Sequence, residues 1–244
     1  MTTPGENEYL LSALPALGEL GQAPPITSVD LLAHVQPFAR PHAIIQAVLL
    51  SDDLLQRQAV LAGEIDEPSP AVLSAEQLRE EAPLPDYLLA LPAHETATHV
   101  MGDDLLWEAY FRCVAKVAAE CRCRFLAEWV GFEVGLRNAL AESRARALDL
   151  NVEGYLVATD LASDTDTFVD VLNEWSTAAT PLAGLRVLDQ ARWAWLEDHD
   201  AWFTFRDDEL AAYAVRLMLL TRWHRLREPE HNTSAAEHAE PTQA

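Results

Sequence analysis

Residues 104–148 constrain the fold more than any other part of the chain. The segment contains no proline, and only Gly131 and Gly135 lower its helical propensity. Its apolar residues recur at steps of three and four, the period of an amphipathic α-helix; they are Phe111, Val114, Ala118, Cys121, Phe125, Trp129, Phe132, Leu136 and Leu140. An unbroken helix of this length would be a rod of roughly 65 Å. The segment therefore predicts an all-α fold, an elongated bundle built on one long central helix. The alternative of two helices joined near Gly131 stays open.

Shorter helices are predicted on both sides of this segment. Thr27 with Asp30, and Ser74 with Gln77, have the spacing of capping boxes that begin helices. Other helical patterns cover residues 41–63, 86–91, 164–178, the segment from 181 onward, and 207–227. Every connecting segment is rich in proline, glycine or polar residues.

We predict three parts along the chain. A hinge-like linker over residues 92–102 separates an N-terminal helical subdomain, 1–103, from a second part, 104–227, which contains the long helix and a C-terminal helical subdomain. Residues 228–244 lack apolar content and are expected to form a disordered acidic tail.

The charge of the chain argues against nucleic acid as a partner. Its formal net charge is −22, whereas phosphate binding needs concentrated Lys and Arg. Acidic residues exceed basic ones by 15 to 3 in residues 1–103 and by 18 to 7 in 149–244, while 104–148 has 6 against 7. A basic partner would therefore meet the flanks, and general solubility is the alternative explanation.

The ends and the cysteines indicate a cytoplasmic protein. The N-terminal residues lack the basic region and apolar stretch of a signal peptide, and no apolar run is long enough to span a bilayer. The three cysteines form no disulfide framework, so reduced thiols are expected.

No motif for catalysis or cofactor binding is present. The phosphate-binding loops GxxxxGK[ST] and GxGxxG are absent, as is GxSxG, and the single lysine, Lys116, lies within the central segment. Cys121 and Cys123 would lie about 200° apart around a helix and cannot share a metal ion. We expect no catalytic residue, no cofactor and no metal.

The segment 104–148 contains one polar cluster. Glu133 and Arg137 are four residues apart in the favourable order for a helical ion pair, and Asn138 lies beside them. Gly131 and Gly135 would let a neighbouring helix approach closely or allow a bend.

Tryptophans are concentrated in the second half of the chain. All seven lie between Trp107 and Trp223. Trp193 and Trp195 cannot share one helix face, so we expect one to be buried and the other to lie at the surface or an interface.

Three segments carry a family resemblance. They are YLLSALPAL followed by PPITSVDLL near the N-terminus, FLAEWVGFEVGLRNALAESRARAL at 125–148, and LDQARWAWLEDHDAWFTFRDDELAAYAVRLMLLTRWHRL at 188–226. Together they resemble an uncharacterised bacterial family associated with V/A-type ATPases. Within it, an acidic residue followed by Arg-Asn on a long helix is similar to the C-type stalk subunit of these rotary ATPases, the counterpart of the eukaryotic d-type subunit.

The resemblance implies a non-catalytic helical subunit that links the central stalk to the membrane rotor ring. Its partners would be other V/A-type ATPase subunits, with no nucleic acid and no direct membrane insertion, and it would be cytoplasmic and peripheral to the inner membrane. It would contribute to proton or sodium transport coupled to ATP synthesis or hydrolysis. The residues expected to build the helix framework or docking surface are Glu133, Arg137, Asn138, Arg192, Trp193, Trp195, Tyr213, Arg222 and Trp223.

Two alternatives remain from the sequence. One is a free-standing helical scaffold or regulatory interaction protein with an unrelated partner. The other is a small-molecule enzyme or binding protein with a deep cavity where carboxylates and histidines converge.

Overall fold

The fold is all-α, as the sequence predicts. A computed structural model describes residues 6–89, 99–163, 168–199 and 203–236, and these residues form ten α-helices, two 3-10 helices and no β-strand. The α-helices are α1 (Glu6–Ala13), α2 (Ser28–Val35), α3 (Ala39–Leu61), α4 (Ala75–Leu78), α5 (Asp86–Leu89), α7 (Gly102–Cys121), α8 (Arg124–Ala147), α9 (Val169–Ser176), α10 (Pro181–His199) and α11 (Asp207–Ala236). The 3-10 helices are η1 (Val152–Tyr155) and η2 (Thr159–Leu161).

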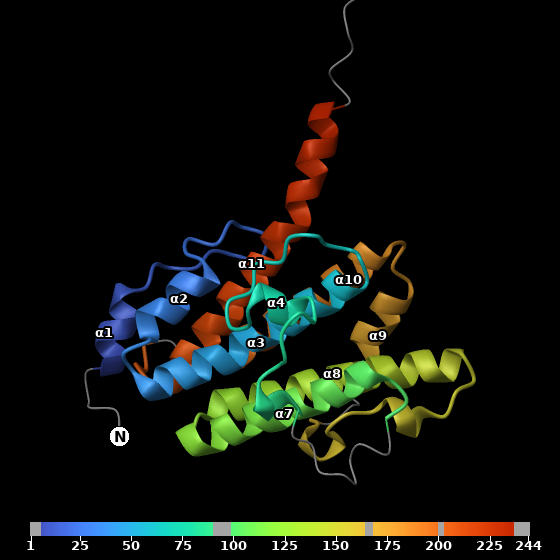
Figure 1. Ribbon diagram of the computed structural model, residues 1–244, viewed down its shortest axis with the longest axis horizontal. Helices are drawn as coiled ribbons and strands as arrows, with labels where there is room; N and C mark the ends of the chain where they lie inside the picture. Colours follow the sequence, from blue (N-terminus) through green and yellow to red (C-terminus); the bar gives the residue numbers. More distant parts are fainter. Residues whose placement is uncertain (1–5, 90–98, 164–167, 200–202, 237–244) are drawn as a thin grey trace, which may run out of the picture.

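The helices pack in two layers. In Figure 1, α7 and α8 lie side by side along the bottom, and α3 and α11 cross above them. The helices α1 and α2 cover one end of the upper layer, while α9 and α10 lie at the other.

The predicted single central helix is wrong, because residues 104–148 form a helical hairpin. Helix α7 ends at Cys121, Arg122 adopts a left-handed conformation with φ of 52°, and α8 begins at Arg124. The N–H of Cys123 bonds to the carbonyl of Ala118 at 2.9 Å, which is the bond of a Schellman motif. The break therefore lies at Arg122, and α8 continues through Gly131 without interruption.

Residues far away in the sequence stabilise this turn. The carboxylate of Asp208 accepts the N–H of Phe125 at 2.9 Å, which satisfies a free donor in the first turn of α8. Arg40 donates to the carbonyl of Cys121 and to Asp207 at the other side of the turn. Both helices of the hairpin bury their apolar stripe in the same core. The three-and-four spacing of apolar residues therefore continues across the turn, and the sequence pattern does not reveal the break.

One hydrophobic core extends through the described residues. Buried side chains from Leu10 in α1 to Leu220 in α11 belong to a single cluster, because α3 packs against both α7 and α11. The predicted boundary between 1–103 and 104–227 therefore does not separate two cores. The linker that suggested it falls largely on residues 90–98, which lie outside the described residues.

Both predicted capping boxes are confirmed. The Thr27 hydroxyl accepts the Asp30 N–H at 3.0 Å, and Ser74 and Gln77 make the same reciprocal pair at the start of α4.

Helix α3 binds the loop that follows it through one buried carboxylate. Its buried Asp53 accepts three backbone N–H groups, from residues 71, 72 and 73, at 2.7 to 2.9 Å. Burial raises the pKa of Asp53 to about 6 despite these bonds.

The C-terminal helix is longer than predicted. Its backbone continues to Ala236, where the sequence indicates a disordered tail from residue 228. A helix that is already formed extends at little cost per residue, and Figure 1 shows this end of α11 standing clear of the body. Residues 237–244 of the predicted tail lie outside the described residues.

The two glycines of α8, Gly131 and Gly135, permit the close approach of another segment, as predicted. That segment is a loop and not a neighbouring helix. A Cβ at Gly131 would lie 2.7 Å from the Ser163 hydroxyl, and one at Gly135 would lie 2.9 Å from the Phe168 ring. The Ser163 N–H bonds to the carbonyl of Gly131 at 2.9 Å. The segment after η2 therefore packs directly on the α8 backbone.

Candidate functional site

A cavity of about 390 Å³ lies between the α7–α8 hairpin and the helices above it. Its walls combine aromatic rings, aliphatic side chains and ion pairs. Helix α3 contributes Ser51 and Leu55, and α7 with its N-cap contributes Met101, Asp104, Trp107, Tyr110 and Phe111. The remaining lining residues are Trp129, Glu133, Arg137, Leu140, Ala141, Arg144, Ala145, Leu148, Leu150, Tyr155, Arg192, Met218 and Arg222. We call this space the central cavity.

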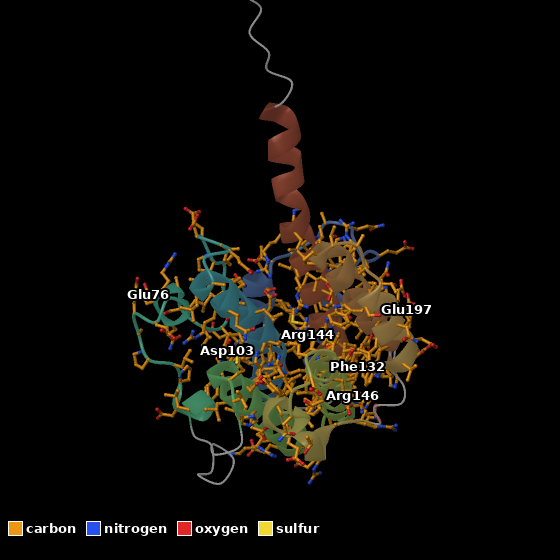
Figure 2. All side chains as sticks on the ribbon, turned by 90° about the vertical axis from the view of Figure 1, so that its right-hand side faces the viewer. Glu76, Asp103, Phe132, Arg144, Arg146 and Glu197 are labelled. Atoms are coloured by element: carbon orange, nitrogen blue, oxygen red, sulfur yellow. The ribbon has the colours of Figure 1, made fainter. Side chains whose placement is uncertain are left out.

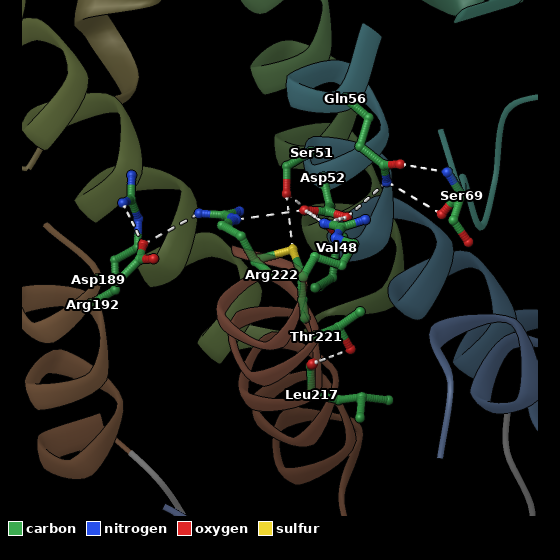
Figure 3. A network of polar contacts seen from close by, with 12 residues as sticks. Val48, Ser51, Asp52, Gln56, Ser69, Asp189, Arg192, Leu217, Thr221 and Arg222 are labelled. Carbon is green, nitrogen blue, oxygen red and sulfur yellow. Dashed lines mark hydrogen bonds and ion pairs between the residues drawn. The ribbon is translucent and has the colours of Figure 1, made fainter. Parts of the chain in front are cut away.

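A line of alternating charges borders the central cavity. It joins four helices and is called here the charge chain; its members in order are Glu133, Arg192, Asp189, Arg222, Asp52 and Arg225. Figure 3 shows its middle, where Arg222 lies between Asp189 on one side and Asp52 on the other. Three carboxylates and three guanidinium groups balance, so the charge chain carries no net charge.

The strongest link of the charge chain joins α8 to α10. Arg192 makes two parallel hydrogen bonds to Glu133, at 2.6 and 3.0 Å, and a third to Asp189 at 3.1 Å. A bidentate pair of this kind fixes geometry as well as contributing energy. Burial acts to lower the pKa of Arg192, but the two carboxylates outweigh it and raise that pKa. The guanidinium is therefore a permanent, partly buried cation.

The other end of the charge chain ties α11 to α3. The Arg222 guanidinium is 3.3 Å from Asp189 and 3.5 Å from Asp52. Arg225 approaches both oxygens of Asp52 at 2.7 and 2.6 Å, and the Gln56 amide donates to the same carboxylate at 3.0 Å. Asp189 is fully buried, and its Oδ2 has no hydrogen-bond partner among the described residues. The contacts of Asp52 with Arg222 and Arg225 hold α3 and α11 in one register.

The predicted ion pair between Glu133 and Arg137 is wrong. Arg137 bonds to Asp104 of α7 at 2.9 Å, and its guanidinium lies 4.9 Å from the centre of the Trp107 ring. Burial lowers the pKa of Arg137, and the bond to Asp104 opposes that shift. Glu133 and Arg137 each pair with a residue of another helix. Their partly desolvated charges gain more from a bidentate or stacked contact between helices than from an exposed pair along one helix.

Asn138 has a structural role away from the cavity. Its side-chain amide donates to the Val157 carbonyl at 2.8 Å and accepts the Val157 N–H at 3.0 Å. The neighbouring backbone N–H of Ala158 bonds to the buried carboxylate of Glu108. Together they attach the segment between η1 and η2 to the hairpin.

The other predicted framework residues are spread over the packing surfaces of α10 and α11. Trp193 is buried, with the Arg216 guanidinium over its ring. Trp195 is partly buried in an aromatic cluster, 5.3 Å from both Phe132 and Trp129 between ring centres. The Tyr213 hydroxyl donates to the Pro15 carbonyl at 2.9 Å, and burial raises the pKa of Tyr213 to about 12. Trp223 lies under the Arg186 guanidinium.

The structure therefore brings Glu133, Arg137, Arg192 and Arg222 together at the central cavity and leaves the other five predicted residues apart. Sequence reasoning missed the acidic partners Asp52, Asp104 and Asp189, and also Trp107 and Arg144. A signal for Asp52 is present, because two aspartates interrupt an otherwise apolar face of the predicted helix over 41–63.

Comparison with known proteins identifies a family. A family model described as "Protein of unknown function (DUF2764)" matches residues 71–233, about two thirds of the chain. The chain belongs to this family. No curated protein and no solved structure matches this DUF2764 protein.

The DUF2764 match contains most of the site. It includes every arginine of the central cavity, whereas α3, with Asp52, precedes it. Among the residues that the structure describes, no group of three or more His, Cys, Asp or Glu side chains is arranged to hold a metal ion. Within the same residues, every helix is too short or too polar to cross a bilayer.

Proposed function

We propose that this protein is a non-catalytic subunit of a bacterial V/A-type rotary ATPase, linking the central stalk to the membrane rotor ring. In this role it contributes to proton or sodium transport coupled to ATP synthesis or hydrolysis. It lies in the cytoplasm, peripheral to the inner membrane, and is held there by contacts with the other subunits.

The charge chain is the observation that carries the proposal. The resemblance to the C-type stalk subunit implies a framework role for Glu133, Arg192 and Arg222, and all three belong to one line of ion pairs that is buried at its centre and partly buried at its ends. That line connects α8, α10, α11 and α3. An adaptor that transmits torque must resist relative sliding of its helices, and a bidentate pair between two helices favours a single register. The geometry supports a stiff body.

A short loop before α11 provides a candidate contact for another ATPase component. Phe203 and Phe205 both have left-handed backbone conformations, with φ of 60° and 51°, which cost about 1–2 kcal/mol for each non-glycine residue. The carboxylate of Glu209 accepts both of their N–H groups, at 3.0 and 2.8 Å. The Phe203 side chain is left 81% exposed. Strain maintained around exposed aromatic rings is typical of binding surfaces.

The test is purification of the tagged full-length chain from host membranes at low salt, followed by mass spectrometry of the retained proteins. We expect the central-stalk and rotor-ring subunits to be recovered. The double substitution Phe203→Ser with Phe205→Ser should abolish this recovery, because it removes the apolar contact without touching the core.

Leu61→Ser is the matched control, since Leu61 is 46% exposed at the far end of α3 and its loss should leave recovery unchanged. Recovery of unrelated soluble proteins alone, with neither stalk nor ring subunits, would reject the proposal in favour of a free-standing helical scaffold or regulator.

A further inference from the structure

The central cavity is the positively charged part of a strongly acidic protein. The chain has 17 basic residues and a net charge of −22. Five arginines, 137, 144, 192, 222 and 225, line the cavity or belong to the charge chain, against the four carboxylates of residues 52, 104, 133 and 189. Each of these carboxylates is already paired with an arginine. These five arginines therefore exceed the carboxylates by one, and the extra guanidinium can pair with an acidic ligand.

Arg144 is that excess cation. It has no ion pair among the described residues, and its guanidinium lies 5.0 Å from the centre of the Trp175 ring. Arg146, two residues further on, pairs with Glu142. Figure 2 looks onto the end of the hairpin, where Arg144 and Arg146 are both labelled. Arg144 is exposed and also lines the cavity, so its donors are available to a molecule entering from solvent.

A second donor in the wall lacks an acceptor. Trp107 is 5% exposed, and its indole Nε1 is buried with no hydrogen-bond partner among the described residues. A buried N–H without an acceptor is unfavourable, and native proteins rarely leave one unused. The guanidinium of Arg137 covers the same ring. Because this Nε1 atom has no accessible surface, it is enclosed by protein, and Trp107 contributes its ring to the wall while Arg144 is the donor that a ligand can reach.

The outer part of the cavity is apolar. Four large aliphatic side chains line it while remaining exposed to solvent: Leu55, Met101, Leu148 and Leu150 are 37%, 53%, 69% and 44% exposed. Exposed apolar groups gathered around a concave site are typical of ligand binding. The volume of about 390 Å³ falls within the range of small-molecule sites.

We propose that the central cavity binds a small organic anion: a carboxylate or phosphate attached to an apolar ring or chain. The acidic group bonds to Arg144, and the apolar body lies against the four aliphatic side chains. This site is independent of the proposed ATPase role, which places no ligand within the chain.

The test uses two fluorescent probes of similar shape and different charge on the full-length protein. The anion is 1-anilinonaphthalene-8-sulfonate, and the neutral compound is N-phenyl-1-naphthylamine. We expect saturable binding of the sulfonate, weakened about tenfold by Arg144→Gln, because a charge-assisted hydrogen bond is lost. Arg144→Lys should retain most of the affinity. Binding of the neutral probe should change less than about twofold in either variant.

Arg146→Gln is the matched control, because it removes an equal charge from the same helix at a side chain that is 72% exposed and does not line the cavity. Equal weakening by Arg144→Gln and Arg146→Gln would overturn the proposal, since it would mean that general charge governs binding. Absence of saturable sulfonate binding to the unmodified protein would also overturn it.

Discussion

Substitution of Arg222 by methionine tests whether the charge chain holds the helices together. The guanidinium attracts Asp189 across 3.3 Å and Asp52 across 3.5 Å, and each attraction is worth about 5 kcal/mol at an effective dielectric constant near 20. Desolvation of the buried ions offsets several kcal/mol of this gain. After the substitution Asp189 keeps Arg192 at 3.1 Å, and Asp52 keeps Arg225 at 2.6 Å. We therefore expect a loss of about 3 kcal/mol in the free energy of unfolding, the low end for breaking a buried pair.

Urea unfolding followed by far-UV circular dichroism measures this loss. Arg124→Met is the control, because Arg124 is 85% exposed and pairs only with Glu128 among the described residues; its substitution should cost less than about 0.5 kcal/mol. In a double-mutant cycle, Arg222→Met and Asp189→Asn should be coupled by about 1–3 kcal/mol. A loss below about 1 kcal/mol for Arg222→Met would refute the reasoning that the charge chain fixes the helix register.

Three further predictions concern the packing of α8 and the loop after α3. Asn138→Ala should lower the free energy of unfolding by about 2–4 kcal/mol, since both backbone groups of Val157 lose their partner. Gly135→Ala should cost about 1–3 kcal/mol, because the new Cβ would lie 2.9 Å from the Phe168 ring. Since burial raises the pKa of Asp53 from 3.8 to about 6, the folded protein binds this proton more tightly than the unfolded chain. The stability from Asp53 is thus complete below about pH 4 and falls by about 3 kcal/mol as the pH rises through 6.

The same urea assay checks these three predictions. Gly102→Ala is the control for Gly135→Ala, because a Cβ at Gly102 would meet nothing within 4 Å; equal effects would contradict the steric argument. For Asp53, the difference in stability between the unmodified protein and Asp53→Asn should decrease between about pH 4 and pH 6. A difference that increases over this interval would contradict the assigned direction of the pKa shift. For Asn138→Ala, a loss under about 0.5 kcal/mol would mean that Val157 finds other partners.

Local signals predicted local structure well. The capping boxes at Thr27 and Ser74 were predictable because each is made by residues three apart along the chain. The all-α class followed from the helical period, which depends only on neighbouring residues. The hairpin turn was not predictable in this way, since Arg122 is not a residue that favours a left-handed conformation.

The site was only partly predictable for the same reason. The sequence placed Glu133, Arg137, Arg192 and Arg222 among the framework residues, but, apart from Asp189 beside Arg192, their partners are 33 to 170 positions away. Helical spacing selected Glu133 with Arg137, whereas burial made contacts between helices more favourable. Nothing in the spacing of Arg144 indicated that it lies beside a cavity, because that depends on how five separate α-helices pack.

The capping of the hairpin turn by Asp208 has a consequence for the order of folding. The turn after Cys121 is completed by residues that the ribosome adds more than 80 positions later. A nascent chain ending before the last helix contains both α7 and α8 but lacks Asp208, which accepts the Phe125 N–H at the start of α8. Closing so long a loop carries an entropic cost that must be met before these bonds form. The hairpin therefore acquires its final stability late in synthesis, when the C-terminal helix has docked beside α3 and onto α8.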